Sequence, residues 1–263
     1  MIIRKRHLSL LTKPNMLYER LLFRGSQYLA QKAKNLNRIA KLKGTVAQRL
    51  NLAYTGSLDL IEIVKPDHPR VIYDVGAHIG TWSLLVKGCI PNATIHAFEP
   101  IDAHITAFKK EMKNIPDITL HSVALGNRWE ELKINITNRS DASSILDPTN
   151  NVDEDYGVRK EKEQTIQVIP LDNYIDKNNI PLPDFIKLDV QGYELEVLKG
   201  ATNCLAHAKW ILCEVSFLHY YQDQPLFHQI ADFLGHYGFS IYAFGTDTPL
   251  GSRCTQADVL FKR

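Results

Sequence analysis

The sequence predicts an α/β protein with a mostly parallel, doubly wound sheet, and three observations support this class. From residue 66 onward, short apolar runs rich in β-branched and aromatic residues alternate with stretches of helical character. A glycine-spaced turn follows the first run directly. The last two runs are joined by a loop too short and too polar for a crossover helix, so we expect them to pair antiparallel.

Length and composition restrict the class further. The chain has 263 residues, enough for one large domain with a small appendage, and its 44% hydrophobic and 23% charged residues are ordinary for a globular protein. No apolar run approaches the ~20 residues of a membrane span, and the N-terminus lacks the pattern of a secretory signal. The four cysteines have no metal-ligand spacing, which favours reduced thiols and a cytoplasmic location.

The N-terminal segment is strongly basic. Residues 1–50 hold twelve Lys and Arg against the single acid Glu19, a charge of +11, so the remainder carries −9 within the formal +2 of the whole chain. This asymmetry indicates contact with something anionic, such as a membrane surface, a nucleic acid, a phosphorylated substrate or the protein's own body. A solvated basic helix face fits equally well. Peripheral membrane contact through residues 1–50 therefore remains open.

Periodicity divides the chain into a basic helical segment, 1–65, and a second domain, 66–263. Residues 15–43 predict one or two amphipathic helices, interrupted near Gly25-Ser26 and ending near Gly44. In the second domain we expect seven strands and four main helices. The strands are 71–75, 94–98, 118–125, 185–190, 210–217, 239–244 and 257–262, and the helices are 80–88, 101–114, 192–206 and 225–237.

An insert at about 128–169 interrupts this alternation. Its flanks, 131–137 and 165–171, alternate like the two strands of a hairpin. The polar stretch between them predicts a long loop that is either functional or disordered.

The turn after the first strand indicates the kind of ligand. A dinucleotide fingerprint needs glycine where His78 stands, and no Lys-Ser/Thr pair follows Gly80 to clamp a phosphate. Asp74 would repel a pyrophosphate and attract a cationic ligand. Glu99, after the next strand, lies where a carboxylate can accept both hydroxyls of a ribose. Together these features indicate a nucleoside without a diphosphate, which fits S-adenosylmethionine (SAM).

Several blocks resemble, in order, the FkbM family of SAM-dependent methyltransferases. They are VIYDVGAHIGTWSLL, IHAFEP, HSVALGN, SDASSIL, VIPLDNYI, DFIKLDVQGYELEVLKGA and WILCEVS, and they cover about residues 70–217. The resemblance implies the class I methyltransferase sheet, with a Rossmann-like arrangement of seven strands ending in an antiparallel hairpin. It also implies SAM as cofactor and methyl transfer to a hydroxyl of a sugar, glycan or glycosylated metabolite.

The resemblance also implies roles for individual residues. The methionine part of the cofactor would lie against Asp74, Gly76, Ala77 and Gly80, and the ribose against Glu99. The adenine would lie near Pro100, Ser122 and Val123. Asp189 ends the fourth strand and could be a catalytic base, a ligand for the methionine ammonium, or a helix cap.

Other candidates come from the neighbouring residues. Glu214 ends the fifth strand and could face Asp189; such a pair could bind Mg²⁺, but no third ligand can be nominated, so a metal is not predicted. His219 could accept a proton or simply pack at the surface. Glu194 could reach the pocket or stabilise a helix N-terminus. In the insert, hydroxyl and carboxylate groups suited to a polyol are Asp141, Ser143 and Ser144.

Two other functions remain open. The basic segment would suit an RNA methyltransferase, although a [DN]PP[YF] pocket motif is absent and LDVQG stands in its place. The chain could also be a non-catalytic SAM-binding scaffold that docks through its basic helices. The glycine spacing argues against an NAD-dependent oxidoreductase. The sequence does not indicate the acceptor's identity or the oligomeric state.

Overall fold

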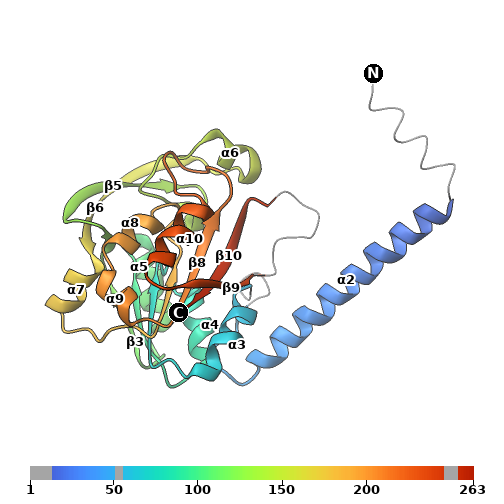
Figure 1. Ribbon diagram of the computed structural model, residues 1–263, viewed down its shortest axis with the longest axis horizontal. Helices are drawn as coiled ribbons and strands as arrows, with labels where there is room; N and C mark the ends of the chain where they lie inside the picture. Colours follow the sequence, from blue (N-terminus) through green and yellow to red (C-terminus); the bar gives the residue numbers. More distant parts are fainter. Residues whose placement is uncertain (1–13, 51–55, 246–253) are drawn as a thin grey trace. The chain divides into compact units, whose positions relative to one another are not determined.

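The computed structural model describes residues 14–50, 56–245 and 254–263, and it divides the chain into two units after Gly44. The first unit contains one unbroken helix, α2 (Pro14–Leu42), drawn in blue in Figure 1. The predicted interruption at Gly25-Ser26 is therefore wrong. A single glycine costs a helix only about 1 kcal/mol, and the Ser26 hydroxyl donates to the carbonyl of Phe23 one turn earlier, which lets the helix continue. In the described part of the chain, no helix is long and apolar enough to cross a membrane.

The second unit is built on the predicted seven-stranded sheet, in the order β3-β2-β1-β7-β8-β10-β9. All neighbouring pairs are parallel except those that β10 makes with β8 and β9, so the terminal antiparallel hairpin is confirmed. The strands are β1 (Val71–Val75), β2 (Thr94–Phe98), β3 (Ile118–His121), β7 (Phe185–Leu188), β8 (Trp210–Ser216), β9 (Ser240–Phe244) and β10 (Gln256–Lys262).

Helices cover this sheet, mostly where the sequence predicts them. They are α3 (Leu58–Val64), followed by the 3₁₀ turn η2 (Lys65–Asp67), then α4 (Thr81–Cys89), α5 (Asp102–Met112), α7 (Leu171–Lys177), α8 (Glu194–Lys199), α9 (Thr202–His207) and α10 (Phe227–His236). The expected helix 192–206 is two helices, because the chain turns at Gly200. A Cβ there would lie 1.9 Å from the carbonyl oxygen of Gly126. The contact-based division falls after Gly44, so α3 lies in the second unit, where Leu58, Ile61 and Val64 are buried.

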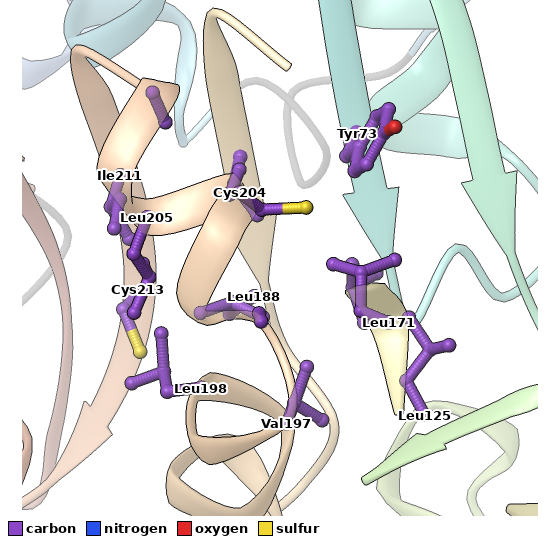
Figure 2. Packing of buried hydrophobic residues seen from close by; sticks show 14 of the residues in the cluster. Tyr73, Leu125, Leu171, Leu188, Val197, Leu198, Cys204, Leu205, Ile211 and Cys213 are labelled. Carbon is purple, nitrogen blue, oxygen red and sulfur yellow. The ribbon is translucent and has the colours of Figure 1, made fainter. Parts of the chain in front are cut away.

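A large hydrophobic cluster packs the second half of the sheet against its helices. Figure 2 shows Leu205 of α9 beside the strand residue Ile211, in the same cluster as Val197 and Leu198 of α8 and Cys204 of α9. All five side chains are almost fully buried. Because complete burial of one such aliphatic side chain contributes about 1.5–3 kcal/mol, this cluster holds the carboxyl ends of β7 and β8 in fixed positions.

The insert forms a second sheet, in the order β4-β6-β5. Antiparallel pairing of β5 (Glu130–Thr137) with β6 (Lys160–Pro170) confirms the predicted hairpin. The expected strand 118–125 is divided, because the chain leaves the main sheet after β3 and joins the second as β4 (Ala124–Gly126). Between β5 and β6 lie the 3₁₀ turn η3 (Ser140–Ala142) and the helix α6 (Asn150–Tyr156) rather than a structureless loop.

Candidate active site

A cavity of about 310 Å³ opens at the carboxyl ends of β1, β2 and β7. The strand order reverses between β1 and β7, because the chain moves outward from β1 to β2 and β3 and returns to the other side with β7. Ligands of open α/β sheets bind at such a reversal, and the volume lies within the ~300–1,000 Å³ usual for small-molecule sites.

The glycine loop after β1 is fixed by close backbone packing. Gly76 has φ +78°, and a Cβ on it would lie 1.8 Å from the carbonyl oxygen of Asp189. The amides of Gly76 and Ala77 both donate to the Phe98 carbonyl, at 3.1 and 3.0 Å. Gly80, at φ +88°, leaves room for the Phe108 ring. The loop therefore lies wedged between the ends of β2 and β7, and Gly76 and Ala77 line the cavity.

Glu99 ends β2 and lines the same cavity, with only 4% of its surface exposed. Its Oε2 accepts from the His78 amide at 2.9 Å, and its Oε1 accepts from the Ile101 amide at 2.8 Å and lies 3.2 Å from Nδ1 of His104. These contacts use three of the roughly four lone-pair positions of a carboxylate. Glu99 thus retains room for about one ligand hydroxyl, rather than the two that the sequence suggested.

Asp74 is fully buried and is not among the residues that line the cavity, so its role in shaping the ligand pocket stays a prediction. The Ser83 hydroxyl donates to its Oδ2 at 2.6 Å, and Nζ of Lys187 lies 3.4 Å from its Oδ1. Burial raises the pKa of the Asp74 carboxyl, while Lys187 and Ser83 act in the opposite direction. Asp74 therefore affects the site through Lys187.

Lys187, on β7, is a further cavity residue that the sequence motifs did not indicate. Its Nζ donates to the Gly76 carbonyl at 3.1 Å and lies 3.3 Å from Oδ2 of Asp189. Burial lowers the pKa of Lys187, but the carboxylates of Asp189 and Asp74 outweigh it and raise the pKa above its ordinary value. A lysine inside an apolar strand needs a buried counter-charge, and this rule could have identified it in FIKLDV.

Asp189 lines the cavity opposite Glu99, and Gln191 ties it to the next strand. The side-chain amide of Gln191 donates to Oδ1 of Asp189 at 2.8 Å and to Oε2 of Glu214 at 2.9 Å. Its own oxygen accepts from the Tyr221 hydroxyl at 3.1 Å. Asp189 and Glu214 are thus brought together as expected, with one amide between them.

Glu214 lies outside the first cavity and lines a neighbouring one of about 150 Å³. Burial, together with the nearby acids Asp189, Asp258 and Glu194, raises its pKa well above its usual range. Asp141 and Gln191 line both cavities. In the described residues, no group of three or more His, Cys, Asp and Glu side chains could hold a metal ion.

The wall next to Glu99 is mostly apolar, as a base-binding surface requires. Pro100 and Val123 line it as expected, but Ser122 is exposed and lies outside it, because the chain leaves the main sheet after His121. Trp82 is also among the residues that line the cavity, and its ring packs against Phe185 with the centroids 5.7 Å apart. Within the described residues its buried Nε1–H has no hydrogen-bond partner.

Two other candidates, His219 and Glu194, lie outside both cavities. His219 is exposed and lines neither cavity, so the structure does not bring it to the reaction centre. Glu194 is buried, accepts through Oε1 from the amides of Val190 and Gly192, and burial raises its pKa to about 7. Glu194 thus stabilises the turn before α8 by accepting two backbone hydrogen bonds.

The candidate residues of the insert differ in whether they line a cavity. Ser143 lines the first cavity, and Asp141 lines both cavities. The Ser144 hydroxyl instead donates to the backbone carbonyl of Gln191 at 2.6 Å. Ser140 meets the glycine loop directly, with its Oγ 3.1 Å from Nε2 of His78. The insert therefore supplies one wall of the site.

The strand order, the reversal at β1 and β7, and the cavity with an acid at each end define a class I methyltransferase fold. Residues 74–241, more than half of the chain, match the methyltransferase FkbM domain. The chain therefore belongs to the FkbM methyltransferase family.

Three relatives are similar to parts of this chain. The hexuronic acid methyltransferase AglP of Haloferax volcanii is 26% identical over 61% of this chain and 62% of its own length. Methyltransferase 1 of Beauveria bassiana is 30% identical over 51% and 59%. The 2-O-methyltransferase NoeI of Sinorhizobium fredii is 26% identical over 65% and 72%. The match thus spans less than two thirds of the first two relatives.

Among solved structures, the magnesium protoporphyrin IX methyltransferase ChlM of Synechocystis PCC 6803 is similar, with a TM-score of 0.47. Its identity to this chain is 12%, over 82% of this chain and 83% of that one.

Proposed function

We propose that this methyltransferase uses SAM as its methyl donor and transfers the methyl group to a hydroxyl of a sugar or glycosylated metabolite. The observation that carries the proposal is the first cavity, in which Glu99 and Asp189 lie on opposite sides of the glycine loop. This loop packs closely against the backbone of Asp189. Support for a sugar hydroxyl comes from the relatives, one named for hexuronic acid and one for 2-O-methylation.

The chemistry of the lining fits SAM. The free acceptor position on Glu99 suits a ribose hydroxyl, and the apolar wall with Pro100 and Val123 suits a purine. At the other side Asp189 presents a carboxylate to the cavity, which suits a cationic ligand. A diphosphate would meet the carboxylates of both Glu99 and Asp189 and would be repelled.

When bound, SAM supplies an electrophilic methyl group on its sulfonium. The protein's task is to align an acceptor oxygen with that group and to remove the proton of the hydroxyl. Asp189 is the carboxylate positioned to accept this proton, since it lines the cavity and Gln191 and Lys187 hold its two oxygens in place. The buried ion pair with Lys187 fixes the direction in which Asp189 points.

Calorimetric titration of the full chain with SAM, S-adenosylhomocysteine and NAD tests the cofactor assignment. We expect both adenosyl compounds to bind and NAD to show no heat of binding. Asp189→Asn should keep the shape of the site and reduce methyl transfer to an oligosaccharide panel at least about 100-fold, as loss of a general base does. Binding of NAD in place of SAM, or full transfer activity in Asp189→Asn, would contradict the proposal.

A further inference from the structure

The second cavity has a defined position in the protein. One side comes from the insert, through η3 and α6, and the other from the end of β8 and the segment after it. Backbone hydrogen bonds hold the two sides together: the Thr149 amide donates to the Tyr220 carbonyl at 2.8 Å, and the Gln222 amide to the Asp147 carbonyl at 2.8 Å. The cavity therefore lies between two segments that backbone hydrogen bonds hold together.

Gln191 connects this cavity to the proposed cofactor site. It lines both cavities, and its amide contacts Asp189 in the first and Glu214 in the second. A reacting hydroxyl must come within about 3–3.5 Å of the methyl group. A compound in the second cavity would reach Asp189 beside Gln191 and Asp141, the two residues that line both cavities.

The second cavity suits a polyol ring. Its lining presents the amides of Gln191 and Gln256, the carboxyl of Glu214 and the aromatic side chains of Tyr156 and Tyr221. Interspersed donors and acceptors recognise hydroxyls, and aromatic side chains cover the apolar face of a ring. At about 150 Å³ the cavity is smaller than a drug-sized site, which limits the group it holds to about one ring.

The charges around the cavity disfavour an anion. Arg139 is the one basic side chain among the described residues of the lining, and its Nη2 already lies 3.1 Å from Oδ2 of Asp141. Burial raises the pKa of the Tyr221 hydroxyl, and the neighbouring acids Glu214, Asp189 and Glu194 raise it further. A ligand carboxylate here would meet no uncompensated positive charge.

Resting on the proposed function, we infer that the second cavity is the acceptor site and that it selects a neutral sugar ring over a uronic acid, because Asp141 neutralises Arg139. Asp141 then acts as a specificity determinant: its removal frees Arg139 to pair with a carboxylate on the ring. A second arginine–aspartate pair of the insert, Arg159 with Asp153 at 3.0 Å, lies outside both cavities and provides a matched control.

The test uses the full chain and three pairs of methyl glycosides: glucoside with glucuronide, galactoside with galacturonide, and mannoside with mannuronide. Saturation-transfer NMR on protein loaded with S-adenosylhomocysteine measures binding of each ring without requiring turnover. We expect at least one neutral member to bind about tenfold more strongly than its uronide. In Asp141→Asn the ratio of uronide to neutral binding should rise about fivefold, while Asp153→Asn leaves it unchanged.

Three results would overturn the inference: equal or stronger binding of the uronides by the natural protein, no binding of any neutral ring, or equal effects of the two substitutions. Calorimetry with S-adenosylhomocysteine on the same samples separates this inference from the proposed function. Nucleoside binding with uronide preference would remove only the inference. Failure to bind the nucleoside would instead contradict the proposed function. Ring binding would then be measured on protein without S-adenosylhomocysteine, and the same results would decide the inference.

Discussion

The two halves of the site are built in different ways. In the half formed by β1 and β2, Glu99 is held by the backbone amides of His78 and Ile101, and the loop beside it packs backbone against backbone. In the half formed by β8 and the insert, Glu214 is held by the side-chain amides of Gln191 and Gln256. Backbone geometry thus fixes the proposed cofactor half, whereas exchangeable side chains determine the acceptor half.

The largest effect that this contrast predicts concerns one glycine from each half. Gly76→Ala places a Cβ 1.8 Å from the Asp189 carbonyl oxygen, and the loop cannot move because it also bonds to Phe98. We expect the free energy of unfolding to fall by more than about 4 kcal/mol in urea titrations. Gly157→Ala, in the insert, has a similar φ of +66° but no atom within 4 Å of the new Cβ, so it should cost only about 1–2 kcal/mol. Similar losses in both variants would show that the close packing of the loop does not matter.

Lys187 provides a second comparison. Lys187→Met leaves the carboxylates of Asp74 and Asp189 without their shared cation in a buried place, and we expect a loss of about 3–5 kcal/mol in the free energy of unfolding. Lys133→Met breaks the exposed pair with Glu163 in the insert and should cost no more than about 1 kcal/mol. Adding Asp74→Asn to Lys187→Met should restore part of the stability. A double variant that is no more stable than Lys187→Met alone would show that Lys187 does not compensate the charge of Asp74.

Glu194 lies at the junction of the two halves and makes stability depend on pH. In the folded protein the Glu194 carboxyl stays protonated up to about pH 7, whereas in the unfolded chain it loses its proton near pH 4.5. Between these pH values the folded state therefore binds one more proton than the unfolded state. Stability should therefore decrease as pH rises from about 4.5 to about 7, by about 3 kcal/mol from this group. Glu194→Gln keeps an oxygen for the amides of Val190 and Gly192 and should flatten that decrease in urea titrations at pH 5 and 8. Glu196→Gln, on the same helix and paired with Lys199, should follow the natural protein.

The same contrast explains what the sequence could predict. The strand order and the positions of Gly76, Glu99 and Asp189 follow from local patterns, since buried strands and glycine turns are encoded by neighbouring residues. The division of 118–125 between two sheets depends on pairing of β4 with β6, more than 40 residues away, which no local pattern reveals. Gln191 was missed as a bridge because its partner Tyr221 lies 30 residues further along the chain.

The smallest predicted effect compares the two glutamates directly. Both oxygens of Glu99 accept backbone N–H groups, so Glu99→Gln turns its amide toward one of these donors and leaves that N–H unpaired, at a cost of about 1–3 kcal/mol in unfolding free energy. Among the described residues, Glu214 receives its hydrogen bonds on Oε2, and the single oxygen of Glu214→Gln can replace it. The raised pKa of Glu214 means that an uncharged amide also resembles the protonated acid. We therefore expect Glu214→Gln to change stability by less than about 0.5 kcal/mol at pH 7. A larger loss in Glu214→Gln than in Glu99→Gln would reverse the contrast, because the side-chain half would then be the less tolerant one.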